Sequence, residues 1–153
     1  LCLEQAGASV EDRGTQLRMV STKPLQGIPP VHTAPYPGFP TDAQAILMAA
    51  LAGGRGQTLF VENMFESRYR HVEELRRMGA DIRVWGRSAV VTGRPLHGQR
   101  VRSTDLRGGA ALVVAALGAR GTTQVTGLSH IRRGYENLEG ILRELGADIR
   151  LLP

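Results

Sequence analysis

The sequence predicts an α/β fold (α+β in some classification schemes) built from a repeated unit of helices and strands. Two observations support this prediction. Residues 74–83, ELRRMGADIR, recur with few changes at residues 141–150, ILRELGADIR. A Thr-Asp pair also precedes an apolar stretch twice, at residues 41–42 and 104–105. Internal similarity of this kind indicates one supersecondary unit that is used more than once.

Each Gly-Ala string is predicted to end a helix and to begin a strand. Glycine adopts the left-handed conformation at a helix end without a steric clash, and a β-branched residue soon after it favours a strand. A third, weaker copy lies at residues 3–10, LEQAGASV. We therefore assign residues 1–20 to the end of one repeat.

The similarity extends backwards from these strings. Both Thr-Asp pairs are predicted to begin helices, which end near the glycine-rich segments 53–56 and 118–121. Strands are predicted directly afterwards, at residues 58–61 and 122–125. Each copy therefore continues from its first helix into a strand.

A turn that contains an arginine, Arg68 or Arg133, then leads into the second helix of each copy. Residues 89–92 follow a further turn and are predicted to pair with the preceding strand as a hairpin. The unit is thus βαβαββ. Residues 41–103 form the second repeat in this scheme, and residues 104–153 form the third.

Residues 21–40 differ from the rest of the chain because they are rich in proline. Five of the eight prolines fall between Pro24 and Pro37. Proline fixes its own backbone and restricts the residue before it to extended conformations. We predict a stiff connection that leads to the helix beginning at Thr41, and connections of this length are more often functional than accidental.

The length of 153 residues corresponds to about one domain, and 42% hydrophobic with 22% charged residues is ordinary for a globular chain. The longest apolar run, residues 43–52, is far shorter than the roughly 20 residues that cross a membrane, and no signal peptide is visible. Cys2 is the single cysteine and cannot form an internal disulfide. We expect a cytoplasmic protein without a membrane partner.

The net charge is +5, and 18 of the 19 basic residues are arginines. A positive charge favours anionic partners, and guanidinium groups suit bidentate contacts to phosphates and carboxylates. The preference for arginine over lysine is equally typical of a source with a particular genome or growth temperature. Three Tyr, three Phe and one Trp are too few for the stacking surface of a single-strand nucleic-acid binder.

The two Thr-Asp helix starts are the first candidates for chemistry. Thr41 is predicted to cap its helix, and Gln44 lies three residues later, as in a capping box. Asp42 and Asp105 occupy matching positions, and each is a candidate general base for a substrate hydroxyl. The alternative is structural, because an aspartate is favourable in any first helical turn.

Further candidates lie close to these helix starts and in the turns. Arg107 precedes two glycines, which indicate close approach of either a ligand or another segment of the chain. Arg68 and Arg133 can each clamp a carboxylate or phosphate, or be surface arginines paired with a nearby glutamate. The four histidines and Cys2 lack metal-ligand spacing, so we predict neither a metal nor another cofactor.

At these residues the sequence resembles a known family. Four strings, in order, are similar to the C-terminal portion of the UDP-N-acetylglucosamine carboxyvinyltransferases, which are enolpyruvyl transferases. The strings are APYPGFPTD at residues 34–42, ENMFESRY at 62–69, TDLRGGAA at 104–111 and HIRRGYE at 130–136. One departure is Arg132, where the family usually has aspartate.

The resemblance implies an inside-out α/β barrel made of three βαβαββ units, of which this chain holds two and part of a third. It implies transfer of an enolpyruvyl group from phosphoenolpyruvate to the 3-hydroxyl of UDP-N-acetylglucosamine. That reaction is the first committed step of peptidoglycan precursor synthesis, and through it of cell-wall formation, cell shape and cell division. The N-terminal domain of the same protein would be missing, so we expect this fragment to be inactive alone.

The resemblance also implies roles for individual residues. Asp42 would take the proton of the sugar hydroxyl, and Asp105 would lie beside the enolpyruvyl group. The substrate-binding residues would be Thr41, Asp42, Met64, Phe65, Arg68, Arg107 and Arg133, with Arg133 holding the phosphate or carboxylate of phosphoenolpyruvate. We expect no nucleic-acid partner, and self-association through uncovered apolar surface.

Two other functions stay open. A 3-phosphoshikimate carboxyvinyltransferase has the same repeated fold and would differ in the substrate that it binds. A basic repeat module that binds nucleic acid without catalysis would show a steep dependence of affinity on salt.

Overall fold

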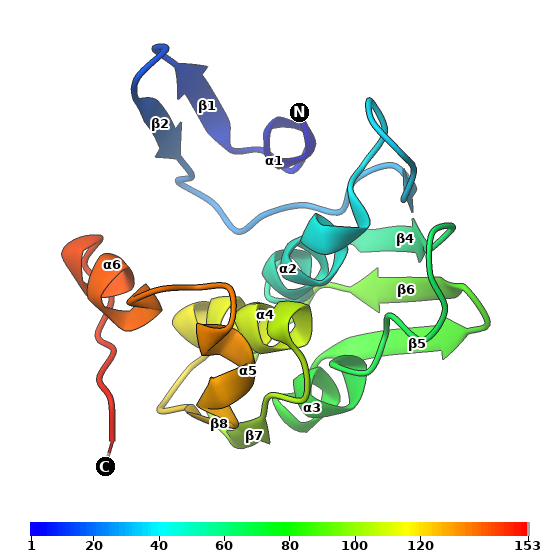
Figure 1. Cartoon of the computed structure of the whole chain (residues 1–153). Coiled ribbons are helices and arrows are strands. Elements are labelled where there is room, and N and C mark those ends of the chain that lie inside the picture. Colours follow the sequence, from blue (N-terminus) through cyan, green and yellow to red (C-terminus); the bar gives the residue numbers. More distant parts are fainter. Residues whose placement is uncertain (153) are drawn as a thin grey trace.

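The computed structural model describes residues 1–152, and these residues form six helices and eight strands (Figure 1). The N-terminal part comprises α1 (Cys2–Gln5) and the antiparallel strands β1 (Ser9–Asp12) and β2 (Leu17–Val20). The central part holds β3 (Val31–His32), α2 (Thr41–Ala52), β4 (Gln57–Val61), α3 (Val72–Arg77), β5 (Asp81–Trp85) and β6 (Ser88–Thr92). The C-terminal part holds β7 (Arg100–Arg102), α4 (Leu106–Gly118), β8 (Gln124–Thr126), α5 (Leu128–Arg132) and α6 (Leu138–Glu144).

The main sheet has the strand order β3-β4-β6-β5. β3 runs parallel to β4, whereas β6 is antiparallel to both of its neighbours. The predicted hairpin is confirmed, because Trp85 pairs with Ser88 across a two-residue turn. β7 and β8 form a second, parallel pair. Alternating helices and strands confirm the α/β fold class.

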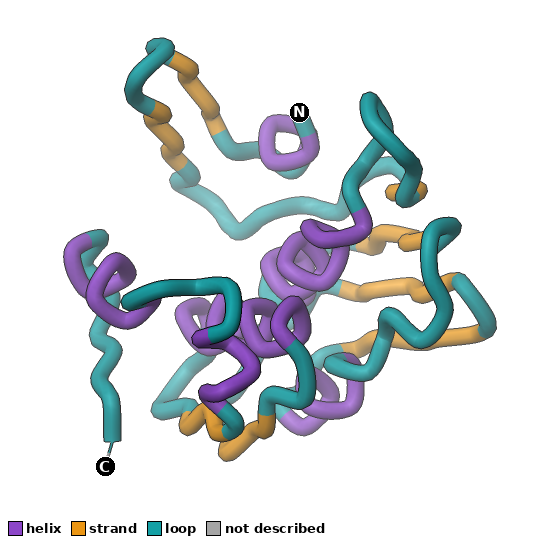
Figure 2. The backbone as a smooth tube through the Cα atoms, in the orientation of Figure 1, coloured by secondary structure: helices purple, strands orange, loops and turns teal. Residues whose placement is uncertain are grey.

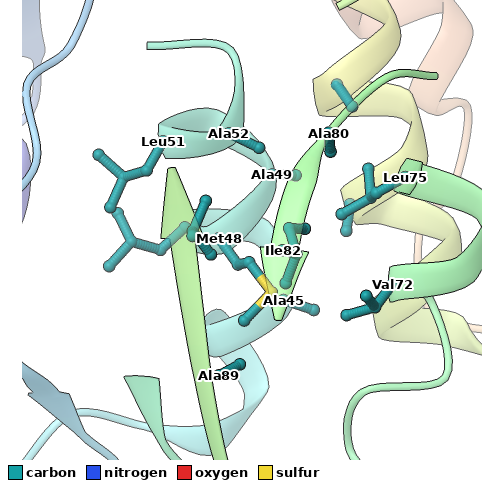
Figure 3. Packing of buried hydrophobic residues seen from close by; sticks show 14 of the residues in the cluster. Ala45, Met48, Ala49, Leu51, Ala52, Val72, Leu75, Ala80, Ile82 and Ala89 are labelled. Atoms are coloured by element: carbon teal, nitrogen blue, oxygen red, sulfur yellow. The ribbon is translucent and has the colours of Figure 1, made fainter. Parts of the chain in front are cut away.

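The hydrophobic core lies between α2, α3 and the main sheet (Figure 3). Met48 of α2, Leu75 of α3 and Phe60 of β4 have no exposed surface, and Ile82 of β5 is 2% exposed. α4 packs against α2, so the helices predicted to begin two consecutive repeats lie side by side (Figures 1 and 2).

The predicted glycine stops are confirmed in all three copies. Gly7, Gly79 and Gly146 have φ values of +95°, +93° and +95°. In each copy the glycine N–H bonds to the carbonyl three residues before it, and the next N–H bonds to the carbonyl five residues before it. This pair of hydrogen bonds is the Schellman motif, which satisfies carbonyl groups at a helix end.

The structure corrects three expectations about secondary structure. Residues 147–150, predicted as a strand, form none, because no strand among residues 1–152 pairs with them. Residues 21–40 are more than a connection, since they contain β3 of the main sheet. The turn that carries Arg133 in the third copy contains an additional helix, α5.

The two helix starts also differ from the predicted pattern. Pro40, not Thr41, precedes the first residue of α2, and the Thr41 hydroxyl donates to Glu62 instead of capping the helix. Asp105 is the N-cap of α4 and accepts a hydrogen bond from the Gly108 N–H at 2.7 Å. Asp42 and Asp105 are therefore not equivalent, although they occupy matching positions in the repeat.

Candidate active site

A buried carboxylate positions the loop that follows β4. Glu62 is 1% exposed, and its Oε1 accepts hydrogen bonds from the N–H groups of Met64 and Phe65 at 2.9 and 3.1 Å. Oε1 also accepts from Thr33 Oγ1, and Oε2 accepts from Thr41 Oγ1, both at 2.9 Å. Glu62 therefore joins this loop to the first residue of α2.

An ion pair connects the first turns of α2 and α4. Arg107 Nε donates to Asp42 Oδ1 at 2.5 Å, although the two residues are 65 positions apart. This hydrogen bond is the main cause of a pKa of Asp42 below its ordinary value of 3.8, and the charge of Arg68 lowers it further. Slight burial opposes these effects. Asp42 is therefore ionised at neutral pH.

The loop between β4 and α3 brings an aromatic ring and a cation to the same place. The Arg68 guanidinium carbon lies 4.4 Å from the centre of the Phe65 ring, a cation–π contact. Ser67 between them has a φ of +58°, a left-handed conformation that is uncommon for residues other than glycine. Such conformations cluster at functional loops, where surrounding contacts maintain them.

A cavity of about 280 Å³ lies between the starts of α2 and α4 and this loop. Its walls come from two helices, because Thr41 and Gln44 belong to α2 whereas Arg107 and Gly108 belong to α4. The sequence predicts that these helices belong to two different repeats. The lining residues are Thr41, Gln44, Ala45, Phe65, Glu66, Ser67, Arg68, Arg70, His71, Asp105, Arg107 and Gly108. A second hollow of about 540 Å³ shares the loop residues 65–68 and 70.

Most of the predicted site residues lie in or beside the first cavity. Thr41, Phe65, Arg68, Asp105 and Arg107 line it, and Asp42 reaches it through the ion pair with Arg107. Three arginines, including Arg70, line the cavity together with the carboxylates of Glu66 and Asp105. The arrangement suits a ligand that carries carboxylate or phosphate groups.

Besides Asp42, which is connected to the cavity only through Arg107, two predicted residues do not line it. Met64 is 38% exposed, and its backbone N–H donates to Glu62. Arg133 is exposed at the C-terminal end of α5, and α5 packs on α4. The substrate-binding roles of both residues stay predictions.

The glycines that follow Arg107 are explained by packing. A Cβ atom on Gly109 would lie 2.3 Å from Ser103 Oγ and 2.6 Å from Ile131 Cγ1. A Cβ atom on Gly108 would lie 2.9 Å from Asp105 Oδ2 and 3.0 Å from the Cβ atom of His71. The sequence left two explanations open for these glycines, close approach of a ligand or of another segment of the chain. Close packing against other segments explains both positions.

Two polar residues of the cavity, Gln44 and His71, were not predicted as part of a binding site. Gln44 is 1% exposed and His71 is 3% exposed. Neither Gln44 Nε2 nor His71 Nε2 has a hydrogen-bond partner within residues 1–152. Burial lowers the pKa of His71 to about 4, although the charge of Asp105 raises it, so the imidazole is neutral near pH 7.

Sequence reasoning could find neither of these residues nor Glu62, because nothing local distinguishes them from exposed polar residues. Their role depends on which segments pack around them.

Within residues 1–152, no group of three or more His, Cys, Asp or Glu side chains is arranged to hold a metal ion. In the same residues no helix combines the length and apolar character that a membrane span requires.

Comparison with known proteins identifies the family. Residues 1–142 match the family described as EPSP synthase (3-phosphoshikimate 1-carboxyvinyltransferase). The chain belongs to this family. Within it, the chain is 44% identical over 148 residues to a UDP-N-acetylglucosamine 1-carboxyvinyltransferase of Halothermothrix orenii, and 49% identical over 152 residues to one of Desulfofundulus thermocisternus.

These alignments cover 97% and 99% of the chain but only 35% and 62% of the two relatives. The chain thus spans about a third of the length of the first relative. Among solved structures, the enolpyruvyl transferase NikO from Streptomyces tendae superposes with a TM-score of 0.83 at 35% identity, over 97% of this chain and 34% of NikO. An EPSP synthase of Acinetobacter baumannii, 19% identical with a TM-score of 0.67, shares the fold.

Proposed function

We propose that this chain is the C-terminal portion of an enolpyruvyl transferase that acts on UDP-N-acetylglucosamine and phosphoenolpyruvate. Relatives at 44–49% identity that carry this name support the proposal. The observation that carries it is the Asp42–Arg107 ion pair, which joins two repeats beside a cavity rich in arginine. The reaction would be the first committed step of peptidoglycan precursor synthesis.

In the proposed chemistry, Asp42 accepts the proton of the sugar hydroxyl. The hydroxyl oxygen forms a bond to C2 of phosphoenolpyruvate while the methylene carbon takes a proton, and loss of phosphate and a proton restores the vinyl group. Arg107 lowers the pKa of Asp42 further below neutral pH, so Asp42 is ionised and able to accept the proton. The hydroxyl becomes acidic only as its oxygen forms the new bond, so a carboxylate of low pKa is sufficient.

The other residues of the proposed site bind and orient the substrates. Arg68 and Arg107 would stabilise negative charge on the phosphorylated acid, and Arg133 would join them. Phe65 offers an apolar surface to the sugar nucleotide, and Met64 would contact it. Asp105 would act beside the enolpyruvyl group, although one of its oxygens is already used to cap α4.

The proposal includes a larger architecture. The repeats would form part of an inside-out barrel that is completed by parts of the protein outside this chain, together with an N-terminal domain that closes over the substrates. Because this chain spans about a third of the first relative, we expect no turnover by the 153-residue chain alone. A cytoplasmic location and self-association of the chain stay predictions.

The test compares two acceptor substrates with the intact protein that contains this chain. Phosphate release from phosphoenolpyruvate should depend on UDP-N-acetylglucosamine and not on shikimate 3-phosphate. The second acceptor is included because the family description names the shikimate enzyme. Release with shikimate 3-phosphate alone would establish that alternative, and release with neither acceptor would refute the proposal.

A further inference from the structure

We propose that Gln44 and His71 form a neutral anion-binding floor of the cavity, where their side-chain nitrogens donate hydrogen bonds to a carboxylate or phosphate oxygen of the ligand. The proposal deepens the proposed function and depends on it for the identity of the substrate. It assigns binding roles to two residues that neither the sequence motifs nor the ion pair had indicated.

The first step is the free-energy cost of two buried polar atoms that have no hydrogen-bond partner in the described part of the chain. Buried polar atoms in folded proteins almost always have a hydrogen-bond partner. Gln44 Nε2 and His71 Nε2 are both buried, and both lack a partner within residues 1–152. The two residues come from different elements, α2 and the residue directly before α3, yet they line one cavity. In the proposal, a ligand in that cavity provides the acceptor that both atoms lack.

The second step is the chemistry of the ligand. An amide nitrogen is only a donor, and a neutral imidazole donates through one of its two nitrogens. The burial that keeps the His71 pKa near 4 keeps this ring uncharged at neutral pH. In the tautomer that carries its proton on Nε2, His71 is a donor as Gln44 is, and two neutral donors suit an acceptor oxygen. Arg68 and Arg70 line the same cavity and favour a negative charge on that oxygen, whereas the charge of Arg107 is already paired with Asp42. A carboxylate or a phosphate meets both requirements.

The third step is the position of Gly108. A Cβ atom there would approach both His71 and Asp105 at 3.0 Å or less, so the glycine allows these two side chains to pack on the first turn of α4. Asp105 raises the pKa of His71, but His71 Nε2 still has no hydrogen-bond partner. His71 is therefore held against α4 while this nitrogen stays available to a ligand.

The experiment measures anion binding by the 153-residue chain without any transferase assay. Inorganic phosphate and pyruvate are titrated separately, and the backbone amide signal of Gly108 is followed by NMR. Gln44→Met and His71→Phe keep the size of the side chain and remove its nitrogens. Their matched controls are Gln124→Met on β8 and His97→Phe, both at exposed positions.

We expect saturable binding of at least one anion, and a dissociation constant that rises about tenfold or more in Gln44→Met and His71→Phe, because hydrogen bonds to charged groups are the stronger ones. The controls should bind as the wild type does. The anion that responds shows whether the floor takes a phosphate or a carboxylate.

A second measurement on the unchanged chain covers the case in which a variant does not fold. The Nε2 signal of His71 should shift to saturation on addition of the same anion, whereas that of His97 should not. Wild-type affinity in both substituted chains, no response of His71, or no binding of either anion would overturn the proposal. Because no sugar nucleotide is used, failure of the proposed function would be seen separately in the phosphate-release assay.

Discussion

Removal of the Glu62 carboxylate should loosen the candidate site more than any change on its surface. Glu62 accepts four hydrogen bonds, from Thr33, Thr41, Met64 and Phe65. Glu62→Ala removes all four and leaves their donors with no acceptor. At about 1 kcal/mol net for each bond, the free energy of unfolding should fall by about 4 kcal/mol, a large fraction of a typical domain's 5–15 kcal/mol.

Glu62→Gln should cost less, about 1–2 kcal/mol. The amide keeps one acceptor oxygen, and the Thr41 hydroxyl can turn to accept from the new amide nitrogen. The assay is urea unfolding of the 153-residue chain followed by circular dichroism, and with a slope of about 2 kcal/mol per M the midpoint should fall by about 2 M for Glu62→Ala.

The matched control is Glu66→Ala in the same loop, where the side chain is 87% exposed and lies 3.9 Å from Arg87. This substitution should change stability by less than about 0.5 kcal/mol. If Glu62→Ala unfolds within 1 kcal/mol of the wild type, the hydrogen bonds of Glu62 do not hold the loop, and the reasoning is wrong.

The remaining predictions concern catalysis, pH and packing. In the intact protein, Asp42→Ala should abolish product formation in the phosphate-release assay with a modest loss of nucleotide-sugar binding; an unchanged rate would remove Asp42 from the mechanism. Between about pH 4 and 6.5, His71 is protonated in the unfolded chain but not in the folded chain. The free energy of unfolding should therefore rise with pH by up to about 3 kcal/mol over this range. Urea unfolding measured over that pH range should show that the free energy of unfolding depends less on pH in His71→Phe than in the wild type. Gly109→Ala should destabilise by about 2 kcal/mol because its Cβ meets Ser103 and Ile131, whereas Gly118→Ala at an open position of the same helix should be neutral or stabilising by up to about 1 kcal/mol. Equal melting temperatures of these two variants would contradict the packing explanation.

Features set by neighbouring residues could be predicted from the sequence. The Gly-Ala strings predicted three helix ends, and all three adopt the expected left-handed glycine and its two hydrogen bonds. The β5–β6 hairpin was predicted for the same reason, since its two-residue turn is a local signal. Local chemistry therefore accounts for the alternation of helices and strands.

Features that need a distant partner were predicted poorly or not at all. Residues 147–150 match β5 in sequence, but a strand needs a neighbour for its backbone groups, and none of residues 1–152 supplies one. Thr41 was predicted as a cap, yet the distant Glu62 takes its hydroxyl. Asp105 and Arg68 line one cavity. Only the family resemblance had placed both residues at the same site, because the distance between them in the sequence gives no such indication.

The location of the cavity at a seam between repeats has an evolutionary consequence. Thr41 and Gln44 on one wall, and Arg107 and Gly108 on the other, belong to two different helices, α2 and α4, which accumulate mutations separately. One wall can acquire new ligand contacts while the opposite wall preserves the shape. A pocket between two helices can thereby change its ligand without the need for any new fold.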